Sequence, residues 1–252
     1  VLFAFLLSTT VCLADTHIPG GPVSGLWTAE NSPYYIDGEV YVPNNDTLII
    51  EPGCSIIFTV WRKFRVDLGA VLKAIGTQDD SIVFKAENES IFHGGGFGGI
   101  HFMMSSDACS LEYCQILFGR SDSDGGGIYC NSSDITIKHC YIHKNIAHRG
   151  GGIFVTNSSG TVIDSCYISY NYIYRDQCLG GGICCDAGAD ILIENNIIDS
   201  NSDNGSSDFG YGGGIYVRNS SPTIINNIIS NNGTDFGGGM RARESNSYIA
   251  NN

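Results

Sequence analysis

The chain is poor in charge, and positive charge is the scarcer kind. Charged residues make up 15% of the 252 residues, and 13 Lys and Arg side chains face 26 Asp and Glu side chains, which gives a formal net charge of −13 at pH 7. A surface of this sign repels phosphate backbones and anionic lipid headgroups. The composition therefore excludes nucleic acid as a partner and argues against docking on an acidic membrane.

Long apolar runs are also scarce. The one at residues 1–14, VLFAFLLSTTVCLA, is too short to span a bilayer and ends in a small residue before Asp15. It has the character of a secretory signal peptide without its initiator Met and basic start, although a buried strand is an alternative interpretation. We therefore expect a secreted or cell-surface protein with no membrane insertion of the mature chain.

Patterns that would indicate catalysis or metal binding are scarce as well. No two of the ten cysteines have the C-x-x-C spacing of a zinc site, and the neighbours Asp79 and Asp80 would point to opposite faces of a strand. Asp122 and Asp124 resemble the start of a calcium loop, but no Glu follows at the required offset, so a solvated turn is favoured. The sequence thus assigns no catalytic residue and no cofactor, and leaves only calcium open.

Glycine, in contrast, is abundant, with 33 residues, and much of it falls in the repeated tetrapeptide GGGI or GGGM. The apolar residue of the motif recurs every 25 to 32 residues, at Ile100, Ile128, Ile153, Ile183, Ile215 and Met240. A repeat of this length with β-type residues is typical of a solenoid with one coil per repeat. The triplets that we interpret as tight corners of the coil, where Gly permits positive φ and close backbone approach, are Gly125, Gly126, Gly127; Gly150, Gly151, Gly152; Gly180, Gly181, Gly182; and Gly212, Gly213, Gly214.

A second repeated signal follows each glycine motif, in lines such as SLEYCQILFG, DITIKHCYIHKN and ADILIENNIIDSN. Aligning these lines places Cys114, Cys140, Cys166, Asn196 and Asn227 at one position, and Asn145, Asn171, Asn201 and Asn232 at another. Equivalent side chains on successive coils would stack about 4.8 Å apart, so the asparagines could form hydrogen-bonded ladders. The cysteines are interpreted as small buried residues, with a Cys140–Cys166 disulfide as the alternative.

Short runs with apolar residues at alternate positions begin at about residue 36, as in YIDGEVYVP and KFRVDLGAVLKAIGT, and are separated by Gly and Pro. We therefore predict an irregular N-terminal segment or cap at residues 15–35. A parallel β-helix of about eight coils should fill residues 36–252 and be truncated at its C-terminus.

The lines GGGIYCNSSDITIKHCYIHKN and GGGIYVRNSSPTIINNIISNN resemble the repeats of right-handed parallel β-helix proteins of the pectin lyase-like fold. The pairing of GGGI with I-x-x-N is also similar to the repeats of chlamydial polymorphic outer membrane proteins. The resemblance covers about residues 36–252. It implies an all-β, single-stranded, right-handed solenoid with three parallel sheets, and it does not specify a function, because this fold serves lyases, hydrolases, epimerases and adhesins alike.

The residue after each apolar marker should point out of the bore. A stack of rings and polar groups at this spacing could bind a sugar chain, although aromatic residues also favour sheets simply for packing. The candidate ligand-binding residues on this column are His101, Tyr129, Phe154, Tyr216 and Arg241.

Two functions follow. The first is a secreted or surface module, without catalysis, that binds a polysaccharide or a surface protein or serves as an adhesin-like stalk. The alternative is a lyase, hydrolase or epimerase acting on polysaccharide, with a site built from residues that meet only in space. Strings typical of such hydrolases, N-T-D, G-H-G and R-I-K, are absent from the sequence, which favours the first function.

Overall fold

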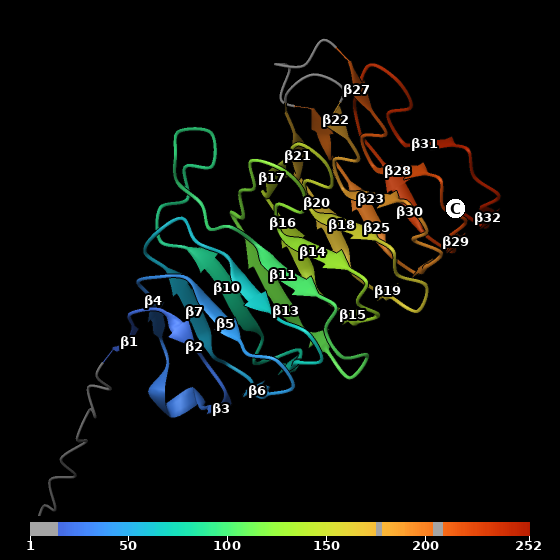
Figure 1. The fold of residues 1–252 in the computed structure, drawn as a ribbon. Helices are drawn as coiled ribbons and strands as arrows, with labels where there is room; N and C mark the ends of the chain where they lie inside the picture. The colour runs from blue at the N-terminus through green and yellow to red at the C-terminus, as the bar shows by residue number, and fades with distance from the viewer. Residues whose placement is uncertain (1–14, 175–177, 204–208) are drawn as a thin grey trace, which may run out of the picture.

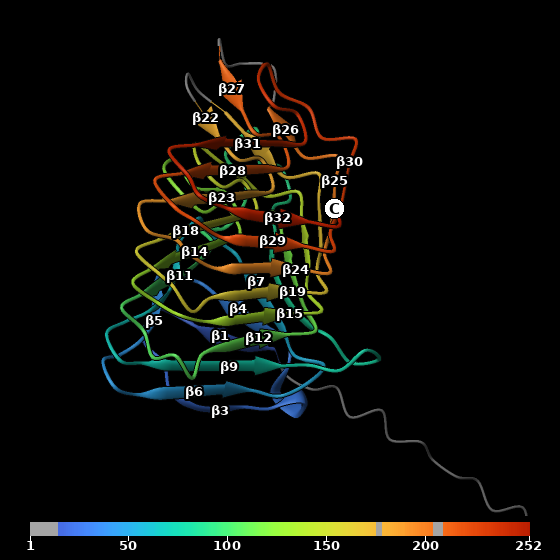
Figure 2. The ribbon, with the colours of Figure 1, turned by 90° about the vertical axis from the view of Figure 1, so that its right-hand side faces the viewer.

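The computed structural model describes residues 15–174, 178–203 and 209–252. The predicted signal peptide, residues 1–14, lies outside the described residues. Three parallel sheets of nine strands each run the length of the molecule, and every coil contributes one strand to each sheet in the order A, B, C. The coils therefore stack as a three-sided solenoid from the N-terminal end to the C-terminal end (Figures 1 and 2).

The strands are short, between two and five residues. Sheet A contains β1 (Thr16–Ile18), β4 (Tyr34–Ile36), β7 (Ser55–Phe58), β10 (Ile82–Ala86), β13 (Cys114–Leu117), β16 (Tyr141–His143), β20 (Tyr167–Ser169), β25 (Ile197–Asp199) and β30 (Ile228–Ser230). Sheet B contains β2 (Gly21–Pro22), β5 (Val40–Val42), β8 (Phe64–Val66), β11 (Ile100–Met103), β14 (Ile128–Asn131), β18 (Ile153–Thr156), β23 (Ile183–Asp186), β28 (Ile215–Arg218) and β31 (Met240–Arg243). Sheet C contains β3 (Gly25–Trp27), β6 (Thr47–Ile50), β9 (Val71–Ile75), β12 (Ser110–Glu112), β15 (Thr136–Lys138), β19 (Val162–Asp164), β24 (Leu192–Glu194), β29 (Thr223–Ile225) and β32 (Tyr248–Ala250).

Alternation of side chains along each strand builds the core. Successive side chains of a strand point to opposite faces, so inward and outward residues alternate. In β16 the middle residue Ile142 faces the bore, whereas in β4 the end residues Tyr34 and Ile36 do. In sheet A the inward column passes through Ile56, Phe84 and Ile116, each at most 1% exposed. The bore is thus filled by one continuous apolar cluster that extends from the first coil to Ile224.

The predicted ladders are confirmed at two corners of the coil. Between sheets A and B, the side-chain oxygen of Asn171 accepts hydrogen bonds from the amide N–H and Nδ2 of Asn145, at 3.0 and 2.9 Å, and Asn201 does the same for Asn171. Between sheets C and A, Asn196 accepts from the amide N–H of Cys166 at 2.8 Å. Each rung therefore satisfies the backbone of the coil before it.

All eight cysteines whose side chains the structure describes are free thiols. They include the ladder residues Cys114, Cys140 and Cys166. The Cys140–Cys166 disulfide is therefore absent, and the amide N–H of Cys140 instead donates to the sulfur of Cys166 at 3.5 Å. Burial raises the pKa of both thiols well above the usual value. These cysteines pack as small buried residues, as the favoured interpretation predicted.

The third corner, between sheets B and C, carries a serine ladder that the sequence interpretation missed. Ser133 accepts from the amide N–H of Ser105, and Ser158 accepts from that of Ser133, both at 3.0 Å. The glycine triplets occupy the entry to sheet B. In Gly150–Gly152 the first residue has φ 60°, and a Cβ on Gly152 would lie 2.6 Å from the carbonyl oxygen of Gly182 in the next coil. The corner prediction for GGGI is confirmed.

Two small sheets lie outside the three-sided body. The connections from sheet A to sheet B pair with one another in successive coils, and their strands are β17 (Ile146–Ala147), β21 (Tyr172–Ile173) and β26 (Ser202–Asp203), and β22 (Cys178–Leu179) and β27 (Gly210–Tyr211). Figure 1 shows β22 and β27 at the upper edge of the solenoid. The described residues contain no helix long and apolar enough to cross a membrane.

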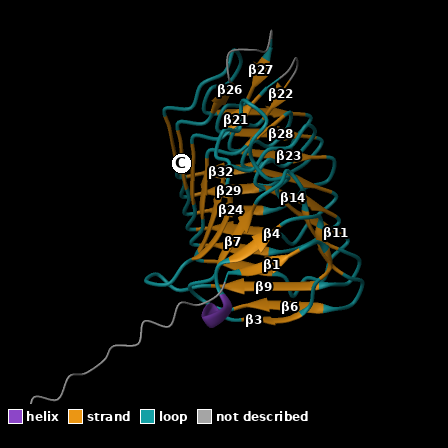
Figure 3. Ribbon diagram, turned by 90° about the vertical axis from the view of Figure 1, so that its left-hand side faces the viewer, coloured by secondary structure: helices purple, strands orange, loops and turns teal. Residues whose placement is uncertain are grey.

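The prediction of an irregular segment at residues 15–35 needs correction. This segment forms β1, β2 and β3, which pair in parallel with β4, β5 and β6 and make a complete first coil. The coil was missed because its strands are only two or three residues long, too short to show alternation. A short 3-10 helix at Ala29–Asn31 then leads into the second coil (Figure 3). The coil added here explains why the sheets have nine strands where about eight coils were predicted.

Candidate functional site

The predicted outward column of sheet B exists and is in register. Parallel pairing aligns His101, Tyr129, Phe154, Cys184 and Tyr216 in successive coils, and Tyr216 aligns in turn with Arg241. The rings stack on one another: the centroids of His101 and Tyr129 are 5.0 Å apart, and those of Tyr129 and Phe154 are 5.5 Å apart. The alignment drawn from the sequence is therefore correct.

This column is not an open platform, which corrects the sequence prediction. Phe154 is only 2% exposed and Tyr216 only 3%, because Leu179 of β22 and Tyr211 of β27 pack over them. The guanidinium of Arg241 lies 4.2 Å from the ring centroid of Tyr211 and so continues the cover. The connections from sheet A to sheet B therefore convert most of the predicted binding column into a second small core.

His101, at the lower end of this column, is 5% exposed. Its Nε2 lies 2.9 Å from the carbonyl oxygen of Gly98, so this nitrogen carries the proton and donates it. Burial, followed by the positive charge of Lys63, lowers the pKa of His101 to about 3. The imidazole is consequently neutral under physiological conditions, and the column carries no charge at this point.

A chain of ion pairs ties the covering connections to sheet B. Arg149 donates to both carboxylate oxygens of Asp124, at 2.7 and 2.6 Å, and to Asp186 at 2.9 Å. Arg218 donates to both oxygens of Asp186, at 2.9 and 2.6 Å, and this pairing raises its pKa. The two carboxylates are 9% and 5% exposed. Both oxygens of each carboxylate accept hydrogen bonds from an arginine, so neither carboxylate is free to act as an acid, a base or a calcium ligand.

A groove lies along the outer face of sheet A, beside the corner between sheets C and A. This groove has a volume of about 410 Å³. The lining residues are Thr77, Gln78, Ser81, Tyr113, Cys114, Gln115, His139, Cys140, Tyr141, Ser165 and Tyr167. They are hydroxyl, amide, thiol and aromatic groups, and the lining contains no carboxylate.

Two stacks of rings form the floor of the groove, and each has an open end. The rings of Tyr113 and His139 stack with centroids 4.6 Å apart, and those of Tyr141 and Tyr167 stack with centroids 5.5 Å apart. Tyr113 and His139 occupy the tight corner between sheets C and A, where positive φ angles of 48° and 51° turn them outward. Ser165 takes the next place in their column, so no further ring covers the upper face of His139. Tyr167 is followed by Ile197 and is 40% exposed.

Polar groups line the end of the groove that is nearer to the N-terminus. The turn between β9 and β10 supplies Thr77, Gln78 and Ser81, and the side-chain amide of Gln115 donates to the hydroxyl of Ser81 at 2.8 Å. Burial raises the pKa of Tyr141, so its hydroxyl is neutral and can both donate and accept. Rings beside hydroxyl and amide groups are the chemistry that recognises a sugar, whose apolar faces pack on aromatics.

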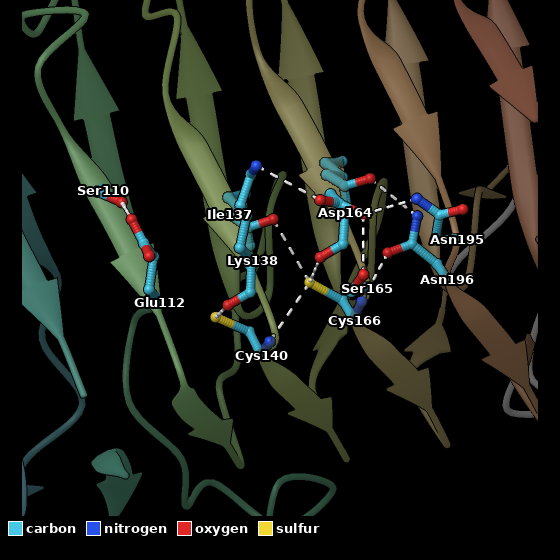
Figure 4. A network of polar contacts seen from close by, with 11 residues as sticks. Ser110, Glu112, Ile137, Lys138, Cys140, Asp164, Ser165, Cys166, Asn195 and Asn196 are labelled. Carbon is cyan, nitrogen blue, oxygen red and sulfur yellow. Dashed lines mark hydrogen bonds and ion pairs between the residues drawn. The ribbon is translucent and has the colours of Figure 1, made fainter. Parts of the chain in front are cut away.

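Charged residues line the rim of the groove at the C–A corner (Figure 4). Glu112, Lys138 and Asp164 align in successive coils, and each comes directly before a groove residue. The ammonium of Lys138 lies 3.4 Å from a carboxylate oxygen of Asp164. Burial alone would raise the pKa of Asp164, but hydrogen bonds from Asn195, Ser165 and Lys138 hold it below its usual range. The rim is thus net acidic.

A family model described as a right-handed β-helix region matches residues 77–252. The chain belongs to the right-handed β-helix family. No curated protein and no solved structure matches the chain. The similarity to chlamydial repeats lies beyond what this match covers and remains a prediction.

The groove of this right-handed β-helix was missed in the sequence, although a signal was present. Its aromatic residues flank the cysteine ladder, in the triplets Tyr113-Cys114-Gln115, His139-Cys140-Tyr141 and Ser165-Cys166-Tyr167. The residues on both sides of an inward cysteine must face outward, so repeated aromatics there predict an outer aromatic face. Among the described residues, no group of three or more His, Cys, Asp or Glu side chains is placed to hold a metal ion.

Proposed function

We propose that this β-helix is a binding module, without catalysis, whose ligand is a glycan chain held in the groove on sheet A. The observation that carries the proposal is the pair of ring stacks, Tyr113–His139 and Tyr141–Tyr167, set in a 410 Å³ groove beside hydroxyl and amide groups. Sugar rings bind by packing their apolar faces on aromatic rings while their hydroxyls exchange hydrogen bonds with such groups.

Binding is favoured over cleavage by the chemistry of the same groove. Glycoside hydrolysis uses two carboxyl groups on either side of the scissile bond, and the groove lining contains none. The alternative, a polysaccharide-active enzyme, has its best candidates in Asp124, in a connection from sheet A to sheet B, and Asp186, on sheet B. Both are held by arginine on two oxygens, and this supports the binding role.

A role outside the cell accompanies this proposal, either as a secreted module or as an adhesin-like stalk at the cell surface. It is supported by the signal-like run at residues 1–14 and by the acidic, weakly charged composition. Fractionation of cells that express the gene, followed by immunoblotting of the medium, the surface fraction and the cytoplasm, tests it. Recovery of the protein only in the cytoplasm would reject this part of the proposal.

Binding is tested by isothermal titration calorimetry of the purified protein with a panel of oligosaccharides. Tyr141→Ala should weaken binding by about tenfold, because one aromatic ring contributes about 1.4 kcal/mol. Tyr35→Ala is the matched control: Tyr35 lies on the same face of sheet A and stacks on His17 at 5.1 Å, but does not line the groove. Equal affinity of the Tyr141 variant and the unchanged protein, or release of new reducing ends from the sugars, would contradict the proposal.

A further inference from the structure

The groove on sheet A also indicates which glycans it accepts, through its charge. Its lining contains one basic residue, His139, and no carboxylate. Outside the lining, the ammonium of Lys138 pairs with Asp164 at 3.4 Å, and that of Lys144 lies 5.8 Å from the ring centroid of Phe118. No lysine or arginine lines the groove to hold the carboxylate of an acidic sugar.

The carboxylates at the rim of the groove would repel an acidic sugar. Glu112 and Asp164 stand directly beside Tyr113 and Ser165 at the rim, and Glu194 follows in the next coil of the same column. Lys138 compensates only one of these three carboxylates. The whole chain adds a net charge of −13. An anionic chain entering the groove would meet repulsion within the screening length of physiological salt, roughly 8 Å.

The spacing of the groove indicates the shape of the ligand. From Ser81 to Tyr167 the groove crosses four successive coils of sheet A, through β10, β13, β16 and β20. Adjacent strands are about 4.8 Å apart, so the groove extends for roughly 14 Å along the solenoid axis. One step of the solenoid is close to the length of one pyranose unit in an extended chain. A straight chain of three or four units therefore matches the repeat, and a coiled chain does not.

We propose that the groove selects a neutral, extended glycan, with three or four pyranose units lying along the solenoid axis, and excludes chains of uronic acids. This inference rests on the proposed function and specifies its substrate class. Tyr113, Tyr141 and Tyr167 present ring edges and hydroxyls at successive coils, the exposed ring of Tyr167 offers an open face at the end of its stack, and Glu112 and Glu194 repel a charged competitor.

Calorimetry at pH 8, where histidine side chains are neutral, separates the outcomes. The probes are cello-oligosaccharides of two to six units, maltohexaose and a galacturonate hexamer. We expect affinity for the cello-oligosaccharides to rise up to the tetramer and then level, maltohexaose to bind at least fivefold more weakly than cellohexaose, and the galacturonate hexamer at least tenfold more weakly. The double variant Glu112→Gln, Glu194→Gln should strengthen binding of the galacturonate hexamer about threefold and leave cellohexaose unchanged.

Equal or tighter binding of the galacturonate hexamer would overturn the charge selection while leaving the groove a glycan site. Equal binding of maltohexaose and cellohexaose would overturn the extended shape. Failure of every probe to bind, the galacturonate hexamer included, would instead reject the proposed function itself.

Discussion

Sheets A and B both carry outward rings that stack between adjacent coils, but only sheet A leaves its rings open. Tyr167 on sheet A is 40% exposed, whereas Phe154 on sheet B is 2% exposed. Their ring neighbours lie at the same distance, 5.5 Å, in both columns. The two faces therefore differ in what covers them and not in how their rings are arranged.

The length of the connections produces this difference. The chain turns from sheet C into sheet A through a corner such as His139-Cys140, too short to reach over any face. The connections from sheet A to sheet B are long enough to form their own strands, β17, β21, β22, β26 and β27, and to place Leu179 and Tyr211 on the column of sheet B. An outward ladder in a solenoid is thus a binding surface only where the connection beside it is short.

The largest expected effect comes from the ion pairs that hold the cover of sheet B. Arg149→Met leaves Asp124 and Asp186 buried without their shared cation, and breaking a buried pair costs about 3–5 kcal/mol. Because the side chain of Arg149 is 27% exposed, we expect a loss of about 3–4 kcal/mol in the free energy of unfolding, measured by denaturant titration. The double variant Arg149→Met, Asp124→Asn should recover part of this loss. A loss below 1 kcal/mol in the single variant would mean that the cover is held by other contacts.

The next effect comes from the buried ring itself. Phe154→Ala removes a ring that packs against Tyr129, Leu179 and the guanidinium of Arg149, so the unfolding free energy should fall by about 3 kcal/mol. Glycan affinity at the groove on sheet A should remain unchanged, as read by the same calorimetry that tests the proposed function. A stable Phe154→Ala protein that has lost glycan binding would reverse the roles that we assign to the two faces.

A smaller effect follows from the neutral state of His101. Burial and Lys63 lower its pKa to about 3 in the folded state, whereas the unfolded chain titrates near 6.5. Below about pH 6.5 the unfolded state therefore binds more protons, and stability falls with decreasing pH down to about pH 3, by up to about 1.4 kcal/mol per pH unit. Between pH 7 and 5.5 this amounts to about 1 kcal/mol. His101→Gln should flatten the curve over this range, and an unchanged pH dependence of unfolding would show that His101 is not its source.

Much of the fold could be predicted from the sequence because repetition supplies redundant information. A single GGGI or a single Asn196 would specify little, but the same residue at the same place in several coils indicates a corner or a ladder that must align. The first coil, Thr16–Trp27, was missed because it carries neither motif and its strands are too short for alternation. The serine ladder through Ser133 and Ser158 was missed as well, because serine is common in turns of any kind.

The candidate site was less predictable, for a physical reason. The sequence shows that the side chain of Phe154 points outward, but exposure depends on whether a connection elsewhere folds back over it. That information lies in Leu179 and Tyr211, in connections whose sequences do not repeat. The aromatic residues beside the cysteine ladder could have been recognised, since Tyr141 and Tyr167 occupy equivalent positions. Their importance becomes clear only when the tight C–A corner leaves that face uncovered.

The smallest expected effect on stability comes from Tyr167→Ala on sheet A, which is the counterpart of Phe154→Ala on sheet B. Both substitutions remove one stacked ring from an outward column, but Tyr167 is 40% exposed and loses mainly its contact with Tyr141. We expect the unfolding free energy to fall by about 1 kcal/mol or less, with glycan affinity reduced about tenfold in calorimetry. Comparing the two losses in unfolding free energy shows how much of the stability of an outward ring comes from the connections that cover it and how much from ring stacking alone. Equal losses in the two variants would show that exposure does not distinguish the two faces, and the assignment of binding to sheet A would lose its physical basis.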